Sequence, residues 1–102
     1  MRKNIYRHMV IFDFHPGTDP DKISLFLSDA ERILSDIPGI NDFQVCQQVS
    51  PKNDFPYCFL MDFDTMEIFK AYEQHPNHSG FVNDRWIPEV SRFMEIDLLV
   101  LA

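Results

Sequence analysis

The sequence predicts a single α+β domain, covering residues 1–102, with elements in the order β-α-β-β-α-β. Three observations support this fold class. Four runs are rich in β-branched and aromatic residues, two stretches repeat apolar residues at helical spacing, and turn-forming residues separate the elements. This order is that of the ferredoxin-like fold, with a four-stranded antiparallel sheet and its helices on one face.

The first half of the chain predicts a strand, a helix and a second strand. Residues 5–14 form an apolar, aromatic strand followed by a proline and glycine turn. Thr18 or Asp19 then caps a helix over residues 20–37, which begins with a proline and repeats apolar residues at steps of three and four. A proline and a glycine end this helix, and residues 42–49 alternate as a half-buried strand.

The second half predicts two further strands and a broken helix. Residues 57–63 form the third strand, and Asp64, with a glutamate three positions later, predicts the cap of the next helix. Pro76 ends that helix because the residue before a proline avoids the helical conformation. We expect a short helix over residues 78–87, before the following proline, and a last strand over residues 92–102.

Composition limits the partners. Sixteen acidic against nine basic residues give a net charge of −7, which opposes binding to nucleic acid or to anionic lipid. No run approaches the ~20 apolar residues of a membrane helix, and the N-terminal residues lack a signal-peptide pattern. We therefore expect a cytoplasmic protein. Cys46 and Cys58 lie in predicted strands and are expected as free thiols, with a disulfide between neighbouring strands as the alternative.

The predicted strands are apolar on both faces. Helices cover one face in this fold class, and a second face open to water should alternate apolar with polar residues. At ~25 cal/mol per Å² an exposed apolar face is costly, so we expect a second copy of the chain to cover it; coverage by the chain's own loops is the alternative. One predicted face holds His8, Val10, Phe12, Phe14, Tyr57, Phe59, Met61, Phe63, Phe93, Leu99 and Leu101, and the other holds Met9, Ile11, Cys58, Leu60, Met94, Ile96, Leu98 and Val100.

Three regions carry a family resemblance: RHMVIFDFHPGTD at 7–19, SDIPGI at 35–40, and the stretch from AYEQHPNHSGF at 71–81 to EIDLL at 95–99. On these residues the sequence resembles the stress-responsive A/B barrel (Dabb) family. The resemblance covers nearly the whole chain. The resemblance implies a homodimeric α+β barrel in which two ferredoxin-like protomers join their sheets. Some members are stress-induced, and a plant branch acts as polyketide cyclases that use a Tyr and a His around an HPxH motif.

The resemblance places that catalytic pair on Tyr72 and His78, with His8 facing the same pocket. On an unbroken helix Tyr72 and His78 would lie about 120° apart around the axis and ~9 Å apart along it, so the break at Pro76 is required to bring them together. His78 would then act as a base while the Tyr72 phenol donates to a developing enolate or oxyanion. In the structural alternative, Tyr72 is a core aromatic and His78 a helix-terminal residue.

The expected pocket is mostly apolar with a few polar tips, which suits a small hydrophobic or aromatic ligand. Tyr57 and Val82 stand where the cyclase branch has a histidine and a glycine, which implies a narrower cavity of different polarity. The residues expected to line the pocket are His8, Val10, Phe12, Phe26, Tyr57, Phe59 and Phe81.

Three interpretations of function follow. The first is a homodimeric stress-response protein that binds a small hydrophobic molecule, and the second is a polyketide cyclase-like enzyme using His78 and Tyr72. The third is a protein that resembles the haem-degrading monooxygenases, which share the dimeric barrel and use a helix-end histidine, or a purely structural protein. We expect no metal and no cofactor, because His75 and His78 lack a third ligand and an HExxH pattern.

Overall fold

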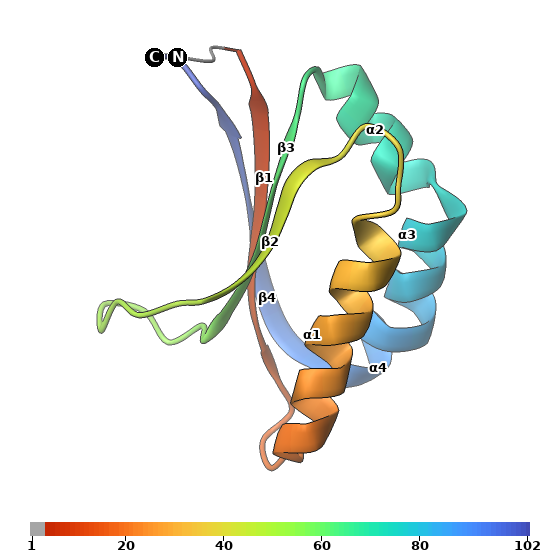
Figure 1. The fold of residues 1–102 in the computed structure, drawn as a ribbon. Coiled ribbons are helices and arrows are strands. Elements are labelled where there is room, and N and C mark those ends of the chain that lie inside the picture. The colour runs from red at the N-terminus through yellow and green to blue at the C-terminus, as the bar shows by residue number, and fades with distance from the viewer. Residues whose placement is uncertain (1–3) are drawn as a thin grey trace.

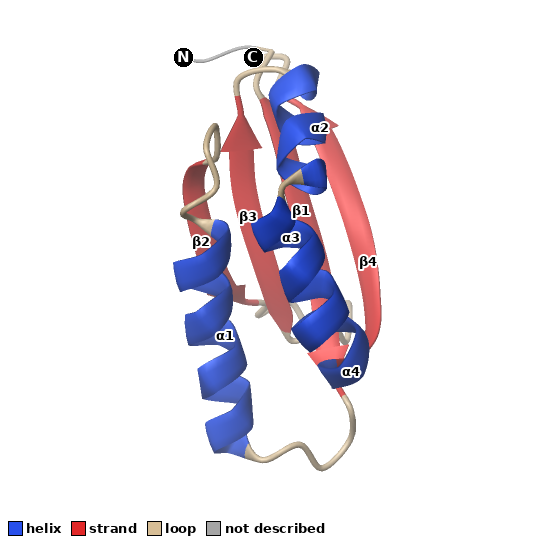
Figure 2. Cartoon of the chain, turned by 90° about the vertical axis from the view of Figure 1, so that its right-hand side faces the viewer, coloured by secondary structure: helices blue, strands red, loops and turns tan. Residues whose placement is uncertain are grey.

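The computed structural model describes residues 4–102 and confirms the predicted ferredoxin-like α+β fold. The strands are β1 (Tyr6–Phe14), β2 (Asn41–Gln47), β3 (Tyr57–Phe63) and β4 (Val90–Leu99), and they pair antiparallel in the order β2-β3-β1-β4. The helices are α1 (Pro20–Leu34), α2 (Met66–Gln74), α3 (Pro76–Phe81), the π-helical segment η1 (Val82–Trp86) and the short α4 (Ile87–Glu89). They all lie on one face of the sheet (Figure 1, Figure 2).

Helix α1 begins as predicted and ends three residues early. The Asp19 side chain accepts a hydrogen bond from the Asp21 N–H at 2.8 Å, so Asp19 is the cap. The helix ends at Leu34 because the chain then turns toward Gly39, whose φ of +89° is left-handed. A side chain at Gly39 would also collide with Ile68 of α2. The expected end at residue 37 is therefore wrong, although Ile37 still packs into the core at 2% exposure.

The predicted ends of the later elements need three corrections. The cap of α2 is Thr65 and not Asp64, because Thr65 has the extended backbone that lets its hydroxyl accept from the Ile68 N–H at 3.2 Å. The helical run after the break extends from residue 76 to 89 instead of 78–87, since Pro88 lies in the first turn of α4, where its missing N–H costs nothing. The last strand is Val90–Leu99, not 92–102.

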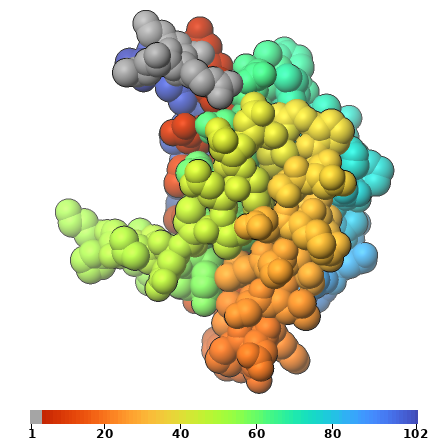
Figure 3. All heavy atoms as spheres, viewed as in Figure 1, coloured from red at the N-terminus to blue at the C-terminus, as the bar shows by residue number. Residues whose placement is uncertain are grey.

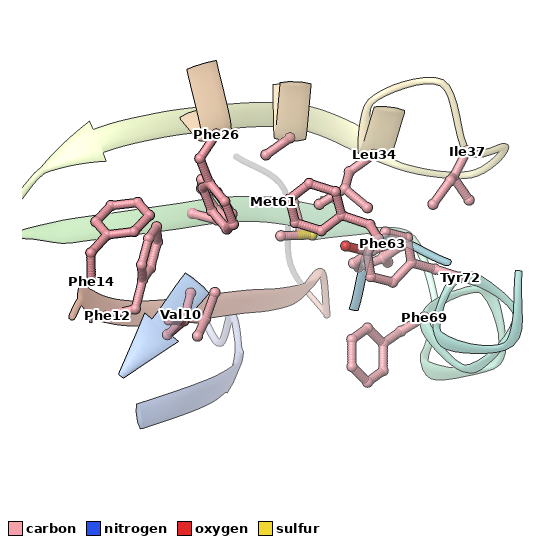
Figure 4. Close-up of a cluster of buried hydrophobic side chains, with 14 residues drawn as sticks. Val10, Phe12, Phe14, Phe26, Leu34, Ile37, Met61, Phe63, Phe69 and Tyr72 are labelled. Carbon is pink, nitrogen blue, oxygen red and sulfur yellow. The ribbon is translucent and has the colours of Figure 1, made fainter. Parts of the chain in front are cut away.

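The inner face of the sheet and the helices enclose an aromatic core (Figure 4). Phe12 and Phe26 are fully buried, and Phe14 meets Phe26 edge to face with ring centroids 5.0 Å apart. The largest of the fully buried side chains are Phe12, Phe26, Phe59, Phe63 and Met61. This packed layer fixes the helices against the sheet and so positions the side chains that surround the site.

The outer face of the sheet carries no helix (Figure 1). The strand register aligns Met9 with Leu60 and with Ile96 in one row on this face, as predicted from the alternation. Met94 is 51% and Leu98 43% exposed. The connection between β2 and β3 projects beyond this side of the sheet (Figure 1, Figure 3). The described loops therefore leave apolar side chains of β4 uncovered on the outer face.

The inner row of β4 differs from the expectation that both faces of every strand are apolar. Glu95 and Asp97 lie next to each other in this row, between Phe93 and Leu99, and these two apolar side chains are 51% and 56% exposed. The register sets Glu95 opposite Val10 and Asp97 opposite His8. The strand at this edge of the sheet thus adds carboxylates to an otherwise apolar layer.

Candidate functional site

A cavity of about 280 Å³ lies between the inner face of the sheet and the helices that follow the break at Pro76. Its walls are mostly apolar, with five polar side chains. The apolar lining consists of Val10, Leu34, Phe59, Met61, Phe81, Val82, Trp86, Ile87 and Phe93, and the polar lining of His8, Tyr72, Glu73, His78 and Glu95. This composition is typical of small-molecule sites, at the lower end of their usual size of ~300–1,000 Å³.

The helix break brings Tyr72 and His78 together. Their ring centroids are 4.8 Å apart, which an unbroken helix would not allow. The break also frees the Glu73 carbonyl, because the Asn77 N–H that would bond to it in a continuous helix donates to the His75 ring nitrogen at 3.1 Å instead. His75 therefore caps α3 and has a structural role.

The ring of His78 forms a hydrogen bond with the freed Glu73 carbonyl. Its Nδ1 lies 3.0 Å from the Glu73 backbone oxygen, and since a carbonyl only accepts, Nδ1 carries the hydrogen. The other ring nitrogen, Nε2, is then the basic one. Burial lowers the pKa of His78 below its usual value, although the Glu73 carbonyl opposes this change. The imidazole is therefore neutral at neutral pH and suited to accept a proton.

Tyr72 presents a phenol to the cavity. The side chain is 2% exposed, and no hydrogen bond within residues 4–102 uses its hydroxyl. Burial, with smaller contributions from Glu73 and Glu95, raises the pKa of this phenol, so it keeps its proton. No side-chain polar atom of residues 4–102 is both fully buried and without a partner, so this hydroxyl opens on to the cavity, where it can donate to a bound molecule. Figure 4 shows Tyr72 extending from α2 over the inner face of the sheet.

His8 forms the third polar element of the cavity, from the β1 side. It is 7% exposed, its Nδ1 lies 2.6 Å from Asp97 Oδ1 on β4, and its ring is 5.0 Å from that of Phe69. The carboxylate holds the Nδ1 hydrogen and orients the ring, as acidic partners of functional histidines do. The pairing with Asp97 did not emerge from the sequence, because it depends on the register between β1 and β4.

The structure brings most of the predicted site residues to one cavity, but not all. Tyr72 and His78 line it, as do His8, Val10, Phe59 and Phe81 from the expected ligand-binding set. Phe12, Phe26 and Tyr57, which were also expected at the pocket, do not line this cavity. Phe12 and Phe26 are fully buried in the core, and Tyr57 packs against Phe12 with ring centroids 5.8 Å apart.

Trp86 also lines the cavity, and it was not among the site residues predicted from the sequence. Its indole ring lies 4.9 Å from the Phe12 ring and 6.1 Å from the Phe26 ring, and it lines the cavity that these two residues do not line. Glu73 and Glu95 also line the cavity unexpectedly. The signal in the sequence was the alternation of β4, which places Glu95 on the same face as Phe93.

No group of three or more His, Cys, Asp or Glu side chains within residues 4–102 has the spacing to hold a metal ion. None of the described helices is both long and apolar enough to cross a bilayer.

The fold and this arrangement define a ferredoxin-like α+β domain with a cavity between its sheet and helices, and the comparisons with known proteins identify its family. The chain belongs to the stress responsive A/B barrel domain (Dabb) family, whose sequence model matches residues 6–100. A Dabb family protein with a ferredoxin-like fold from Mesorhizobium loti is 40% identical, with a TM-score of 0.91 over 96% of this chain and 98% of that one. A search of curated proteins gives no match.

Two more distant structures share the fold. A dimeric ferredoxin-like protein of unknown function from Thermobifida fusca is 16% identical, with a TM-score of 0.80 over 98% of this chain and all of that one (100%). A hydroxynitrile lyase from Passiflora edulis is 13% identical, with a TM-score of 0.84 over 97% of this chain and 95% of that one. At these identities the likeness shows the fold alone.

Proposed function

We propose that this Dabb family protein acts as a homodimer in which each protomer binds a small, mostly apolar molecule in the cavity beneath the helix break. The observation that carries the proposal is the cavity itself, about 280 Å³ in volume, lined by aromatic side chains and by Tyr72, whose hydroxyl has no hydrogen-bond partner among residues 4–102. Apolar walls supply affinity for such a molecule, and the few polar groups orient it.

The homodimer is supported by the outer face of the sheet. Met94 and Leu98 are about half exposed there, and they are continuous with the row of Met9, Leu60 and Ile96. A contiguous apolar face of this kind marks an interface. The T. fusca relative is described as dimeric. The same face on a second protomer provides a self-complementary partner.

Binding of 4-fluorophenol tests the cavity, with ¹⁹F NMR line broadening as the readout. Val82→Phe places a ring in the cavity, because Val82 lines it from η1, and we expect at least about tenfold weaker binding. Val49→Phe is the matched control, since Val49 is 86% exposed and lies outside the lining. Equal broadening by wild type and Val82→Phe, or none by wild type, would contradict the proposal.

The geometry of Tyr72 and His78 supports a second function, proton transfer on a β-keto or phenolic substrate. His78 Nε2 is the free basic nitrogen, and the Tyr72 phenol is a donor 4.8 Å away between ring centroids. In this reaction the base would remove a proton from the carbon next to a carbonyl, while the phenol stabilises the enolate oxygen.

Deuterium exchange at the acidic carbon of an aryl β-keto ester, followed by NMR, measures this activity. His78→Ala should lower the protein-dependent rate by about 10²–10⁴-fold, and Tyr72→Phe should lower it while leaving the fold intact. If both variants exchange at the wild-type rate, these residues have no catalytic role. A haem titration separates the haem-degrading alternative: a Soret shift that disappears in His78→Ala would replace the present proposal.

A further inference from the structure

Apart from the histidines His8 and His78, the ionisable side chains near neutral pH that line the cavity are acidic. Glu73 reaches it from the last turn of α2 and Glu95 from the inner row of β4, whereas the lining contains no lysine and no arginine. Neither carboxylate forms an ion pair with another residue in the range 4–102. The polar side of the cavity therefore carries negative charge that described side chains do not neutralise by contact.

The two carboxylates act on the same space. The pKa of Glu73 is raised, mainly by burial, with Glu95 and Asp97 adding to the increase and His8 and Lys70 opposing it. Glu95 also acts electrostatically on Tyr72 and on His78, so it lies within reach of the polar groups that line the cavity. A ligand that carries a negative charge would be repelled by both carboxylates in this space.

The remaining walls favour a cation with an apolar body. Phe59, Phe81 and Trp86 present aromatic rings, whose negative faces attract an ammonium group and whose area favours an apolar one. The Tyr72 hydroxyl, which opens on to the cavity and has no hydrogen-bond partner among residues 4–102, supplies one further polar contact. Carboxylates beside aromatic faces satisfy an ammonium group that leaves water, which a purely apolar cavity would not do.

We propose that the molecule held in this cavity is an amine, protonated at neutral pH, with its ammonium group at Glu73 and Glu95 and its apolar body among Phe59, Phe81 and Trp86. This inference rests on the proposed ligand-binding function and narrows it to a chemical class. It also predicts that ligands bearing a carboxylate in place of the amine are rejected.

Three probes of nearly equal size test the charge preference: phenethylamine, phenethyl alcohol and phenylacetate. Trp86, the only tryptophan of the chain, lines the cavity and reports binding through its fluorescence. At neutral pH we expect the amine to bind at least about tenfold more tightly than the alcohol, and the acid more weakly than both. Added salt should weaken binding of the amine and leave that of the alcohol unchanged.

Two variants separate the local carboxylates from the general negative charge of the chain. Glu95→Gln should reduce the preference for the amine over the alcohol by at least about fivefold. Glu67→Gln, an equal change of charge at an exposed position outside the lining, should keep the preference. Circular dichroism confirms that both variants fold.

The outcomes distinguish this inference from the function on which it rests. If the alcohol and the acid bind as tightly as the amine, or if Glu95→Gln and Glu67→Gln behave alike, the charge preference is wrong and the ligand-binding function stands. If none of the three probes changes Trp86 fluorescence while 4-fluorophenol binds, the amine class is wrong. If 4-fluorophenol also fails to bind, both proposals fail.

Discussion

The inner and outer faces of the sheet are built from alternating residues of the same strands, yet the helices of the chain cover only one of them. On the inner face Phe12 is fully buried, whereas on the outer face Met94, opposite Ile11, is 51% exposed. The helices all lie over the inner face (Figure 2). A chain of 102 residues supplies helices for one face alone, so the sequence encodes one core and one apolar surface.

The inner face is itself divided into a packed end and a hollow end. At the packed end, rings such as Phe14 and Phe26 interlock; at the hollow end, the break at Pro76 holds α3 over a cavity. The polar residues gather at the hollow end, where space is available for a bound molecule. Packing therefore accounts for one part of this layer, and ligand binding is our interpretation of the other.

Of the effects predicted here, the largest should be the loss of stability when an aromatic ring is removed from the packed end. Phe26→Ala deletes a fully buried ring and leaves a cavity, so the free energy of unfolding should fall by about 3–5 kcal/mol. Phe93→Ala is the control on the same layer, because Phe93 is 51% exposed, and it should cost about 1 kcal/mol. Urea denaturation measures both. Equal losses would mean that the packed and open parts of the inner face do not differ.

A charge on the outer face should separate the protomers. In the proposed dimer Met94→Lys buries an unpaired ammonium group in each of two copies, so we expect at least about 100-fold weaker association. Leu25→Lys is the matched control, since Leu25 is 58% exposed on α1, away from the outer face. Light scattering should give twice the 12.1 kDa chain mass for wild type and control, and a monomer for Met94→Lys. A monomeric wild type at micromolar concentration would remove the basis of the proposed assembly.

The fold and part of the site were predictable from the sequence because both depend on local periodicity and on prolines. Alternation in β1 assigned His8 and Val10 to one face, and Pro76 located the break that places Tyr72 beside His78. The ends of elements were less predictable. Asp64 and Thr65 are both good helix caps, and the extended backbone of Thr65 decides between them.

The rest of the site depends on contacts between distant segments. Glu95 lies opposite Val10 only because of the register between β1 and β4, which shifts at a bulge after Asp13. Trp86 reaches the cavity from the π-helical segment, whose extra residue per turn no periodic pattern reveals. The strand and helix patterns therefore predicted Phe12 and Phe26 at the pocket, but could not predict that Trp86 packs against them there.

The alkylation rates of the two thiols measure how far a reagent can reach the outer face of the sheet. Cys46 and Cys58 are directly opposite each other across β2 and β3, and both are free. Burial, with a smaller contribution from Cys46, raises the pKa of Cys58 to about 11. Iodoacetamide should therefore alkylate Cys58 at least about tenfold more slowly than Cys46, as mass spectrometry of digested protein would show. Met94→Lys should speed the reaction of Cys46 by separating the protomers. An unchanged rate would place Cys46 outside the proposed interface.

The smallest expected effect concerns the titration of His78 at the hollow end. Because burial lowers its pKa, the folded state favours the neutral ring, and this lowers stability as pH falls through 6.5 toward the lowered value. Glu73, whose pKa is raised, contributes the opposite trend, since stability falls as pH rises above 4.5. The difference in unfolding free energy between wild type and His78→Gln isolates the histidine, and it should grow in favour of wild type as pH rises to 6.5.

NMR of the imidazole nitrogens measures the same group directly and links it to the cavity charge. The His78 midpoint should lie below 6.5. Glu95 favours the protonated ring, so Glu95→Gln should lower the midpoint further, whereas Glu67→Gln should leave it unchanged. A midpoint that rises in Glu95→Gln, or one that moves equally in both variants, would show that Glu95 does not act on His78 across the cavity. In that case the hollow end would lack the shared electrostatic environment that sets it apart from the packed end.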